Sequence, residues 1–301
     1  MAGCGRQVHL CEMRKRLLAA AILFALPASA QQSNPPSDSS TDAGPAAQSD
    51  YSVKTTLRDF VTDEYRMWTS PFRVSDYDAH TMEKYGFPFL GVSAALIATD
   101  QTTSRGLPRA GTQAFIWSGR VSQIGAPYTL AGATATLFFL SKAAHEDHLT
   151  ETGFLSMDAL AHSELIGLVI KEATQRERPV NVTTSISRNG FWDGGQSFYS
   201  GHATGAFAVA TVVAYEYGGQ HIAVPIIGFT LASIVSASRV SGRQHWVSDV
   251  FVGSAMGFME GRYIYKRHHN PDLPGSRVRR ASRLIPDFDV GINGGSLYWE
   301  F

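Results

Sequence analysis

The chain has 301 residues, of which 44% are hydrophobic and 17% are charged, so it carries enough apolar side chains for a large core. Its 26 Lys and Arg residues are balanced by 26 Asp and Glu residues. This balance argues against a nucleic-acid-binding protein, because such proteins usually carry a basic excess. The two cysteines, Cys4 and Cys11, lie at the extreme N-terminus, which excludes a disulfide scaffold and a cysteine-based zinc site.

The first 50 residues are expected to lie outside the folded domain. Residues 1–30 are predicted to be a signal peptide, because an Arg-Lys-Arg motif at 14–16 precedes a short apolar run and a small-residue cleavage pattern ending at Ala30. An N-terminal anchor helix is the alternative, although the run is shorter than the ~20 residues of a membrane span. Residues 31–50 contain no Lys, Arg or aromatic residue, so they are predicted to form a disordered linker.

Residues 51–270 are predicted to form one all-α domain, because long apolar-rich stretches are broken by Gly, Pro and polar clusters. The expected helices cover residues 56–69, 78–99, 108–119, 127–145, 152–177, 201–217, 221–237 and 245–267. In the C-terminal tail, residues 271–301, apolar residues alternate before the turn sequence Asn293-Gly294-Gly295 and apolar residues follow it. This pattern favours a small β-hairpin after the helical bundle.

Membrane insertion is an open alternative for this bundle. Residues 121–141 and 222–238 are uncharged, but the other apolar runs are shorter than a membrane span. The predicted helix 152–177 carries Asp158 and Glu164 near its middle, which is costly in lipid. The sequence therefore favours a soluble or peripheral protein over an integral one.

Three polar stretches carry the candidate chemistry. They are Lys171-x6-Arg178-Pro179, Ser200-Gly201-His202 and Ser238-Arg239-x5-His245-x3-Asp249. The cations and the Ser-Gly turn suit a tetrahedral anion such as phosphate. On a helix that ends at Pro179, Lys171 and Arg178 would lie on one face, and the N–H groups of a helix opening at Gly201 attract anions.

The histidines supply the reactive groups. His245 and Asp249 lie at i and i+4, so the carboxylate can accept a hydrogen bond from one ring nitrogen and leave the other free for nucleophilic attack. His202, which belongs to another predicted helix, can then act as a general acid.

These three motifs, in this order, resemble the signature of the type 2 phosphatidic acid phosphatase and vanadium haloperoxidase superfamily. The resemblance covers about residues 125–265 and implies a helical bundle of the acid phosphatase/vanadium haloperoxidase type. It departs at Tyr199, where the family usually has proline, and this departure affects the expected substrate choice more than the chemistry. The side chains expected around the mouth of the site are Tyr199, Phe191, Trp192 and Trp246.

The resemblance also implies a role for each motif residue. The groups that would hold the phosphate oxygens are Lys171, Arg178, Arg239, Ser200 and Gly201. His245 is implied as the nucleophile and Asp249 as its orienting partner, while His202 would protonate the leaving oxygen and then activate water. Because three positive side chains neutralise the phosphate charge, no metal and no other cofactor is expected.

The expected function is therefore metal-independent hydrolysis of phosphate monoesters through a phosphohistidine, with lipid phosphates and diphosphates among the candidate substrates. The signal and the family point to a bacterial periplasm, with the inner membrane as a site of association. The expected partner is a phosphorylated small molecule or lipid and not a nucleic acid, and no oligomeric state is predicted. Two alternatives stay open: a vanadium-dependent haloperoxidase, which would bind vanadate on His245, and a non-catalytic phosphate- or lipid-binding module.

Two further charged segments carry less weight. His145 and His148, with the acidic residues between them, are interpreted as a solvated loop after a helix in preference to a metal site. The basic stretch at 277–283 is interpreted as a solvated tail in preference to a site for anionic lipid headgroups.

Overall fold

The computed structural model describes residues 53–73, 79–181, 190–273, 287–291 and 294–298. The chain divides into two units, Met1–Pro45 and Ala46–Phe301, and every described residue belongs to the second unit. The predicted signal peptide, residues 1–30, and the predicted linker, residues 31–50, lie outside the described residues. The same is true of the basic stretch at 277–283.

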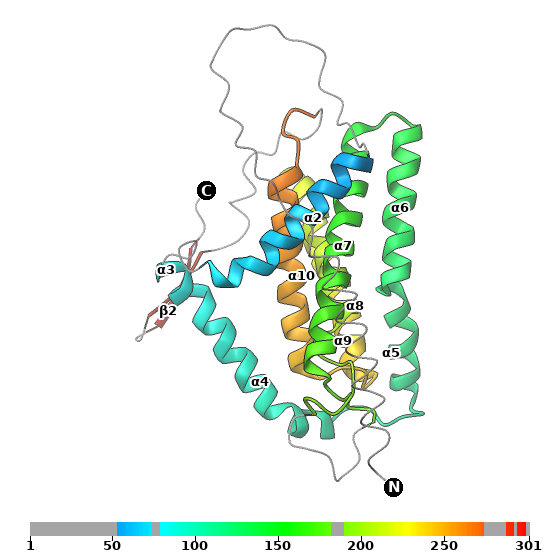
Figure 1. Cartoon of the computed structure of the whole chain (residues 1–301). Coiled ribbons are helices and arrows are strands. Elements are labelled where there is room, and N and C mark those ends of the chain that lie inside the picture. The colour runs from blue at the N-terminus through cyan, green and yellow to red at the C-terminus, as the bar shows by residue number, and fades with distance from the viewer. Residues whose placement is uncertain (1–52, 74–78, 182–189, 274–286, 292–293, 299–301) are drawn as a thin grey trace, which may run out of the picture. The chain divides into compact units, whose positions relative to one another are not determined.

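The structure is mostly helical, so the predicted all-α class is confirmed (Figure 1). The helical elements are α2 (Val53–Thr69), η1 (Ser70–Phe72), α3 (Ala79–Thr81), the π-helical η3 (Met82–Gly86), α4 (Phe87–Arg105), α5 (Gln113–Ile124), α6 (Pro127–Ala143), α7 (Asp147–Thr174), α8 (Gly201–Tyr217), α9 (Ala223–Ser241) and α10 (Val247–His268). Two strands, β1 (Asp287–Gly291) and β2 (Gly294–Tyr298), pair antiparallel and form the hairpin that the tail pattern favoured.

Several helix boundaries differ from the prediction: α4 ends at Arg105 and not at 99, α5 covers Gln113–Ile124 and not 108–119, and α9 ends at Ser241 and not at 237. Two further differences concern the ends that position the motifs. α7 ends at Thr174 and not at residue 177, because Gln175 adopts a left-handed conformation with φ 45° and ψ 40°. α10 begins at Val247 and not at residue 245, with Trp246 as its N-cap. The first motif thus turns sharply after its lysine, and His245 lies just before a helix.

The centre of the fold is formed where α7, α8 and α10 pack together. Side chains that are at most 1% exposed come from all three helices: Leu155, Ala159, Ala208, Val212 and Ile264. Figure 1 shows these helices side by side. Three of the four helices whose ends carry the motifs therefore form this buried centre.

Small residues allow α8 and α10 to touch at their backbones. Gly253, Gly257 and Gly261 recur every four residues and share one face of α10. A Cβ at Gly257 would lie 2.0 Å from the carbonyl oxygen of Thr204, and one at Gly261 would lie 2.5 Å from that of Ala208. This is the small-xxx-small pattern of closely packed helices, in which glycine removes the side chains that would separate two backbones.

The ionisable residues of α7 have partners inside the bundle. His162 is fully buried, and its Nδ1 lies 2.6 Å from Oε1 of Glu64 while its Nε2 lies 3.6 Å from Oδ1 of Asp158. Ser163 donates a hydrogen bond of 2.6 Å to Glu260. Because polar groups inside a membrane protein are tolerated where they pair within the bundle, these residues do not argue against insertion.

The peripheral helices expose many large apolar side chains. Those on α5, α6 and α9 that are more than 40% exposed include Trp117, Phe139, Leu140, Ile226, Ile227 and Leu231. Three segments are long and apolar enough to cross a membrane: Gln113–Ala143, Asp147–Thr174 and Ala223–Ser241. Large exposed apolar side chains on helices of this length favour contact with a membrane.

The contact between α8 and α10 predicts that Gly257 tolerates no side chain. We expect Gly257→Ala to lower the free energy of unfolding by about 1–3 kcal/mol, because its Cβ overlaps a rigid backbone carbonyl. The measurement is the thermal unfolding of the purified protein in detergent. Gly132→Ala on α6 is the matched control, since no atom of the described residues lies within 4 Å of its Cβ position, and it should be neutral or stabilising. Equal effects of the two changes would contradict this account of the packing.

Candidate active site

Backbone hydrogen bonds bring the three motifs together. The N–H of Val180, just after the first motif, donates to the carbonyl of Arg243 at 2.9 Å. The N–H of Ser200 donates to the carbonyl of Asp249 at 3.1 Å and so joins the second motif to the third. Segments that are far apart in the sequence therefore meet at the C-terminal ends of α7 and α9 and the N-terminal ends of α8 and α10.

Lys171 and Gly201 lie next to each other in this site. Lys171 is in the last turn of α7, and its Nζ lies 3.0 Å from the position that a Cβ on Gly201 would occupy. Gly201 is the first residue of α8, whose opening turn leaves N–H groups without partners in the helix. The absence of a side chain at Gly201 lets the Lys171 ammonium and the Glu164 carboxylate, whose Oε1 lies 3.4 Å from the same position, approach this helix N-terminus. The free N–H groups of such a terminus attract anions.

Two arginines complete the set of cations. Nη1 of Arg178 donates to Oε1 of Gln244 at 2.8 Å, and Nη1 of Arg239 donates to Oγ of Ser122 at 2.5 Å. The expectation that Lys171 and Arg178 share one helix face is wrong, because α7 ends between them and Arg178 lies in the loop that follows.

Some buried polar groups of the site make no hydrogen bond to any described residue. Oγ of Ser200 and Nε of Arg239 are the examples among the predicted binding residues. Buried donors are normally paired, and a bound phosphate would supply acceptor oxygens to both. The donor set of the site therefore fits a tetrahedral oxyanion.

The backbone fixes the orientation of the His245 ring. Nδ1 of His245 lies 2.7 Å from the carbonyl oxygen of Ser197. A carbonyl oxygen only accepts hydrogen bonds, so Nδ1 carries the proton and Nε2 of the neutral ring keeps its lone pair. Burial lowers the pKa of His245 to about 4, despite the opposing effect of Asp249, so the ring is neutral and nucleophilic at neutral pH.

Asp249 is near His245 but does not accept its hydrogen bond. Its Oδ2 lies 3.7 Å from Nδ1 of His245, which is beyond hydrogen-bonding distance. The predicted hydrogen bond from His245 to Asp249 is therefore wrong, because the Ser197 carbonyl accepts the hydrogen bond from Nδ1 instead. The Asp249 carboxylate then acts on His245 through its negative charge. Burial favours the protonated form of Asp249, but the adjacent His245 ring, the charge of Arg176 and the hydrogen bond from the Ser197 hydroxyl lower its pKa below the usual value.

The carboxylate of Asp249 is held by a buried arginine that the sequence analysis missed. Nη1 of Arg176 lies 2.5 Å from Oδ1 of Asp249, and Nη2 lies 2.7 Å from Oδ2 of Asp100. Arg176 is fully buried, and its guanidinium lies 4.5 Å from the ring centroid of Phe191 and 5.2 Å from that of Trp246. Spacing alone could not find it, because Arg176 is one of the unspecified residues of the first motif.

Asp100 was missed for a different reason. It lies on α4, upstream of the region that resembles the family, and it is 1% exposed. One of its oxygens accepts from the N–H of Ser248 at 3.1 Å, and the other accepts from the Ser248 hydroxyl at 2.5 Å. Asp100, Arg176, Ser248 and Asp249 thus form one buried network behind His245.

The aromatic residues expected at the mouth of the site differ strongly in exposure. Tyr199 and Trp246 are each only 2% exposed, and the Trp246 indole donates to the carbonyl of Glu177 at 2.8 Å. Trp192 is 77% exposed. The expectation that Tyr199 shapes the mouth is wrong, because its ring is buried against α7 near Gly167.

His202 lies in the first turn of α8 among the cations of the site. Burial and then the charges of Arg239, His245, Lys171 and Arg178 lower the pKa of His202 to about 3. The ring is therefore neutral at neutral pH when no anion is bound. Negative charge bound beside it would reverse this effect and favour its protonated form.

Comparison with known proteins finds a family match over part of the chain. Residues 155–272 match the PAP2 superfamily, and this range contains all three motifs and all the predicted site residues. This part of the chain is therefore a PAP2 superfamily domain, and the resemblance proposed from the motifs is confirmed.

Two relatives of known annotation and one solved structure are similar to the chain. It is 41% identical over 69 residues to a lipid A 1-phosphatase of Porphyromonas gingivalis, covering 23% of this chain and 16% of that protein. It is 35% identical over 101 residues to a lipid A 4′-phosphatase of Helicobacter pylori, covering 33% and 44%. The matches thus span less than half of either relative. The crystal structure of a transmembrane PAP2-type phosphatidylglycerolphosphate phosphatase from Bacillus subtilis aligns with a TM-score of 0.42 and 19% identity, covering 73% of this chain and 98% of that one.

The buried network predicts that Arg176 acts through Asp249 and His245. We expect Arg176→Lys to lower kcat for phosphate release at least about 10-fold with little change in KM, because lysine keeps the charge but loses the planar fork that binds two carboxylates. Arg243→Lys is the matched control and should behave as wild type. A rise in KM alone would show instead that Arg176 serves substrate binding.

The charges around His202 predict a measurable shift in its titration. We expect Arg239→Gln to raise the pKa of His202 in the free protein, because a nearby positive charge disfavours the protonated ring. Inorganic phosphate added to the wild type should raise this pKa in the same direction. NMR titration of protein with labelled histidines measures both effects. A pKa of His202 that does not change when phosphate is added would show that the anion binds elsewhere.

Proposed function

We propose that the chain is a membrane-associated phosphatase that hydrolyses phosphate monoesters of lipids through a phosphohistidine on His245. The observation that carries this proposal is the hydrogen bond from Nδ1 of His245 to the Ser197 carbonyl, which leaves Nε2 with its lone pair. The same site contains three cations, Lys171, Arg178 and Arg239, that match the charge of a phosphate. The PAP2 domain and the names of the relatives agree with this assignment.

The proposed first step transfers the phosphoryl group to the enzyme. Nε2 of His245 attacks phosphorus in line with the ester oxygen, and the bond between phosphorus and that oxygen breaks. The electron pair stays on the leaving oxygen, which receives a proton from His202. Lys171, Arg178 and Arg239 neutralise the charge on the equatorial oxygens, so this chemistry needs no metal ion.

The proposed second step restores the enzyme. Water attacks phosphorus while the now neutral His202 accepts a proton from it. The bond between phosphorus and Nε2 of His245 breaks, its electron pair returns to the ring, and inorganic phosphate leaves. The low pKa of His202 in the free site fits this cycle, because the substrate phosphate itself brings the negative charge that favours protonation.

Lipid substrates fit the surface of the molecule better than soluble esters. The segments Gln113–Ala143, Asp147–Thr174 and Ala223–Ser241 are each long and apolar enough to cross a membrane. Two of them carry catalytic candidates at their C-terminal ends, Lys171 and Arg239, so a phosphate headgroup at the membrane surface would meet the site. The relatives named as lipid A phosphatases favour a phosphorylated lipid as the substrate, met at a membrane after export of the chain.

The proposal predicts which histidines are needed for turnover. The purified full chain in detergent should release phosphate from a lipid phosphate monoester faster than from a chromogenic soluble ester, and activity should survive EDTA. His245→Ala should abolish release, and His202→Ala should slow it by about 10²–10⁴-fold. His221→Ala, which changes an exposed histidine, should leave it unchanged.

The outcomes of this experiment separate the alternatives. Acid-labile labelling of the wild type by a phosphate-labelled substrate, absent from His245→Ala, would support the phosphohistidine. Unchanged turnover in His245→Ala would overturn the mechanism. Halide oxidation with added vanadate and peroxide, without phosphate release, would indicate a haloperoxidase, and substrate binding without turnover would indicate a binding module.

A further inference from the structure

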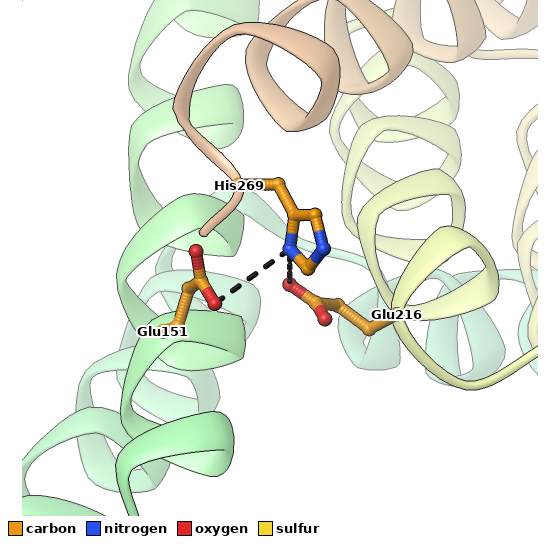
Figure 2. Close-up of side chains that lie close together, drawn as sticks. All are labelled: Glu151, Glu216 and His269. Atoms are coloured by element: carbon orange, nitrogen blue, oxygen red, sulfur yellow. Dashed lines mark ion pairs between the residues drawn. The ribbon is translucent and has the colours of Figure 1, made fainter. Parts of the chain in front are cut away.

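A second polar cluster lies at the other end of α8 from the proposed active site. Glu216 is near the C-terminal end of α8, and Glu151 and His269 face it from α7 and from the residue after α10 (Figure 2). Glu216 follows His202 by 14 residues, which is about 21 Å along a helix. The cluster therefore belongs to no part of the proposed phosphate chemistry.

Each carboxylate of this cluster uses only one of its oxygens in hydrogen bonds. Oε1 of Glu151 accepts from the N–H of Asn270 at 2.6 Å, and Oε2 of Glu216 lies 2.8 Å from Nε2 of His148. Oε2 of Glu151 and Oε1 of Glu216 make no hydrogen bond to the part of the chain that the structure describes. Glu216 is fully buried and Glu151 is 2% exposed, so two desolvated anionic oxygens face a common centre.

The distances between the facing atoms fit metal coordination better than direct hydrogen bonds. Nδ1 of His269 lies 3.5 Å from Oε1 of Glu216 and 3.6 Å from Oε2 of Glu151 (Figure 2). A charge-assisted hydrogen bond would be about 2.7–2.9 Å long. Two ligands on one tetrahedral zinc ion, each bound at about 2.0–2.1 Å, lie about 3.4 Å apart. The three atoms all lie within 4.8 Å of one another, so a single ion can reach them together.

We propose that Glu151, Glu216 and His269 bind one divalent transition-metal ion. One imidazole nitrogen with two carboxylate oxygens suits zinc and similar ions, whereas Mg²⁺ and Ca²⁺ favour oxygen ligands throughout. The contact of His148 with Glu216 is the outer interaction that typically orients a metal-binding carboxylate. The His269 ring stacks on Tyr265 with a centroid distance of 4.4 Å, which holds its plane.

The ion would act on the fold and not on the reaction. Its ligands come from α7, α8 and the segment after α10, so it would tie together the ends of the three helices that form the buried centre. The predicted solvated loop is also revised here, because His148 is paired with Glu216 and belongs to the first turn of α7. His145 is exposed, in line with that interpretation.

The test uses the full chain in detergent, without a histidine tag, after removal of bound metal and of the chelator. We expect one equivalent of Zn²⁺ to raise the thermal unfolding midpoint by several degrees, since a ligand that binds only the folded state stabilises it. His269→Ala and Glu216→Gln should each abolish this shift and weaken Zn²⁺ binding at least about 100-fold. His148→Ala should weaken binding about 10- to 100-fold. His221→Ala is the matched control and should bind Zn²⁺ as the wild type does.

A readout on the unmodified protein keeps the proposal testable if a variant fails to fold. Co²⁺ added to the metal-free wild type should give visible absorption typical of a low-coordinate nitrogen and oxygen site, and Zn²⁺ should displace it. His245→Ala should bind Zn²⁺ normally, so failure of the phosphatase proposal and failure of this one are distinguishable. A wild type without Zn²⁺-dependent stabilisation, or a folded His269→Ala with unchanged affinity, would show that the cluster is only an ion pair with protonated His269.

Discussion

The arrangement of the candidate site depends on one buried ion pair, between Arg176 and Asp249. A guanidinium with no exposed surface is stable only if its donors and charge are matched, and two carboxylates and three aromatic rings provide this. Because Arg176 follows α7 and Asp249 opens α10, their contact fixes the ends of two helices relative to each other. Asp249 is then held 3.7 Å from His245 without taking its proton.

The cations of the site, unlike Arg176, are not matched by an equal number of carboxylates. Burial and then nearby charges, those of Arg239, Lys171 and Arg178 among them, lower the pKa of His202. The three cations also repel one another in the free site, and the charge of Glu164 offsets part of that repulsion at Lys171. Such an arrangement is unfavourable until an anion enters, and the bound anion then relieves the repulsion. The network of Arg176 with its two carboxylates thus has matched charges, whereas the cations that face the phosphate repel one another.

The sequence was sufficient for the helical class, for most helices and for the residues that meet in the site. α8 spans Gly201–Tyr217, which is the predicted range of 201–217. Long-range partners could not be predicted in this way. Asp100 pairs with Arg176 across 76 residues, and Glu151, Glu216 and His269 meet only because three helices pack together. The turn at Gln175 was missed because a left-handed residue other than glycine has no clear sequence signal.

The glycine face of α10 has a mechanical consequence for the whole molecule. With the backbone of α10 lying directly on that of α8, a slide of one residue, about 1.5 Å, would drive each helix into the carbonyl oxygens of the other. The two helices therefore move as one rigid block that carries His202 and Asp249 together. Movement within the bundle must then come from other helices such as α5, α6 and α9, whose outer faces expose large apolar side chains.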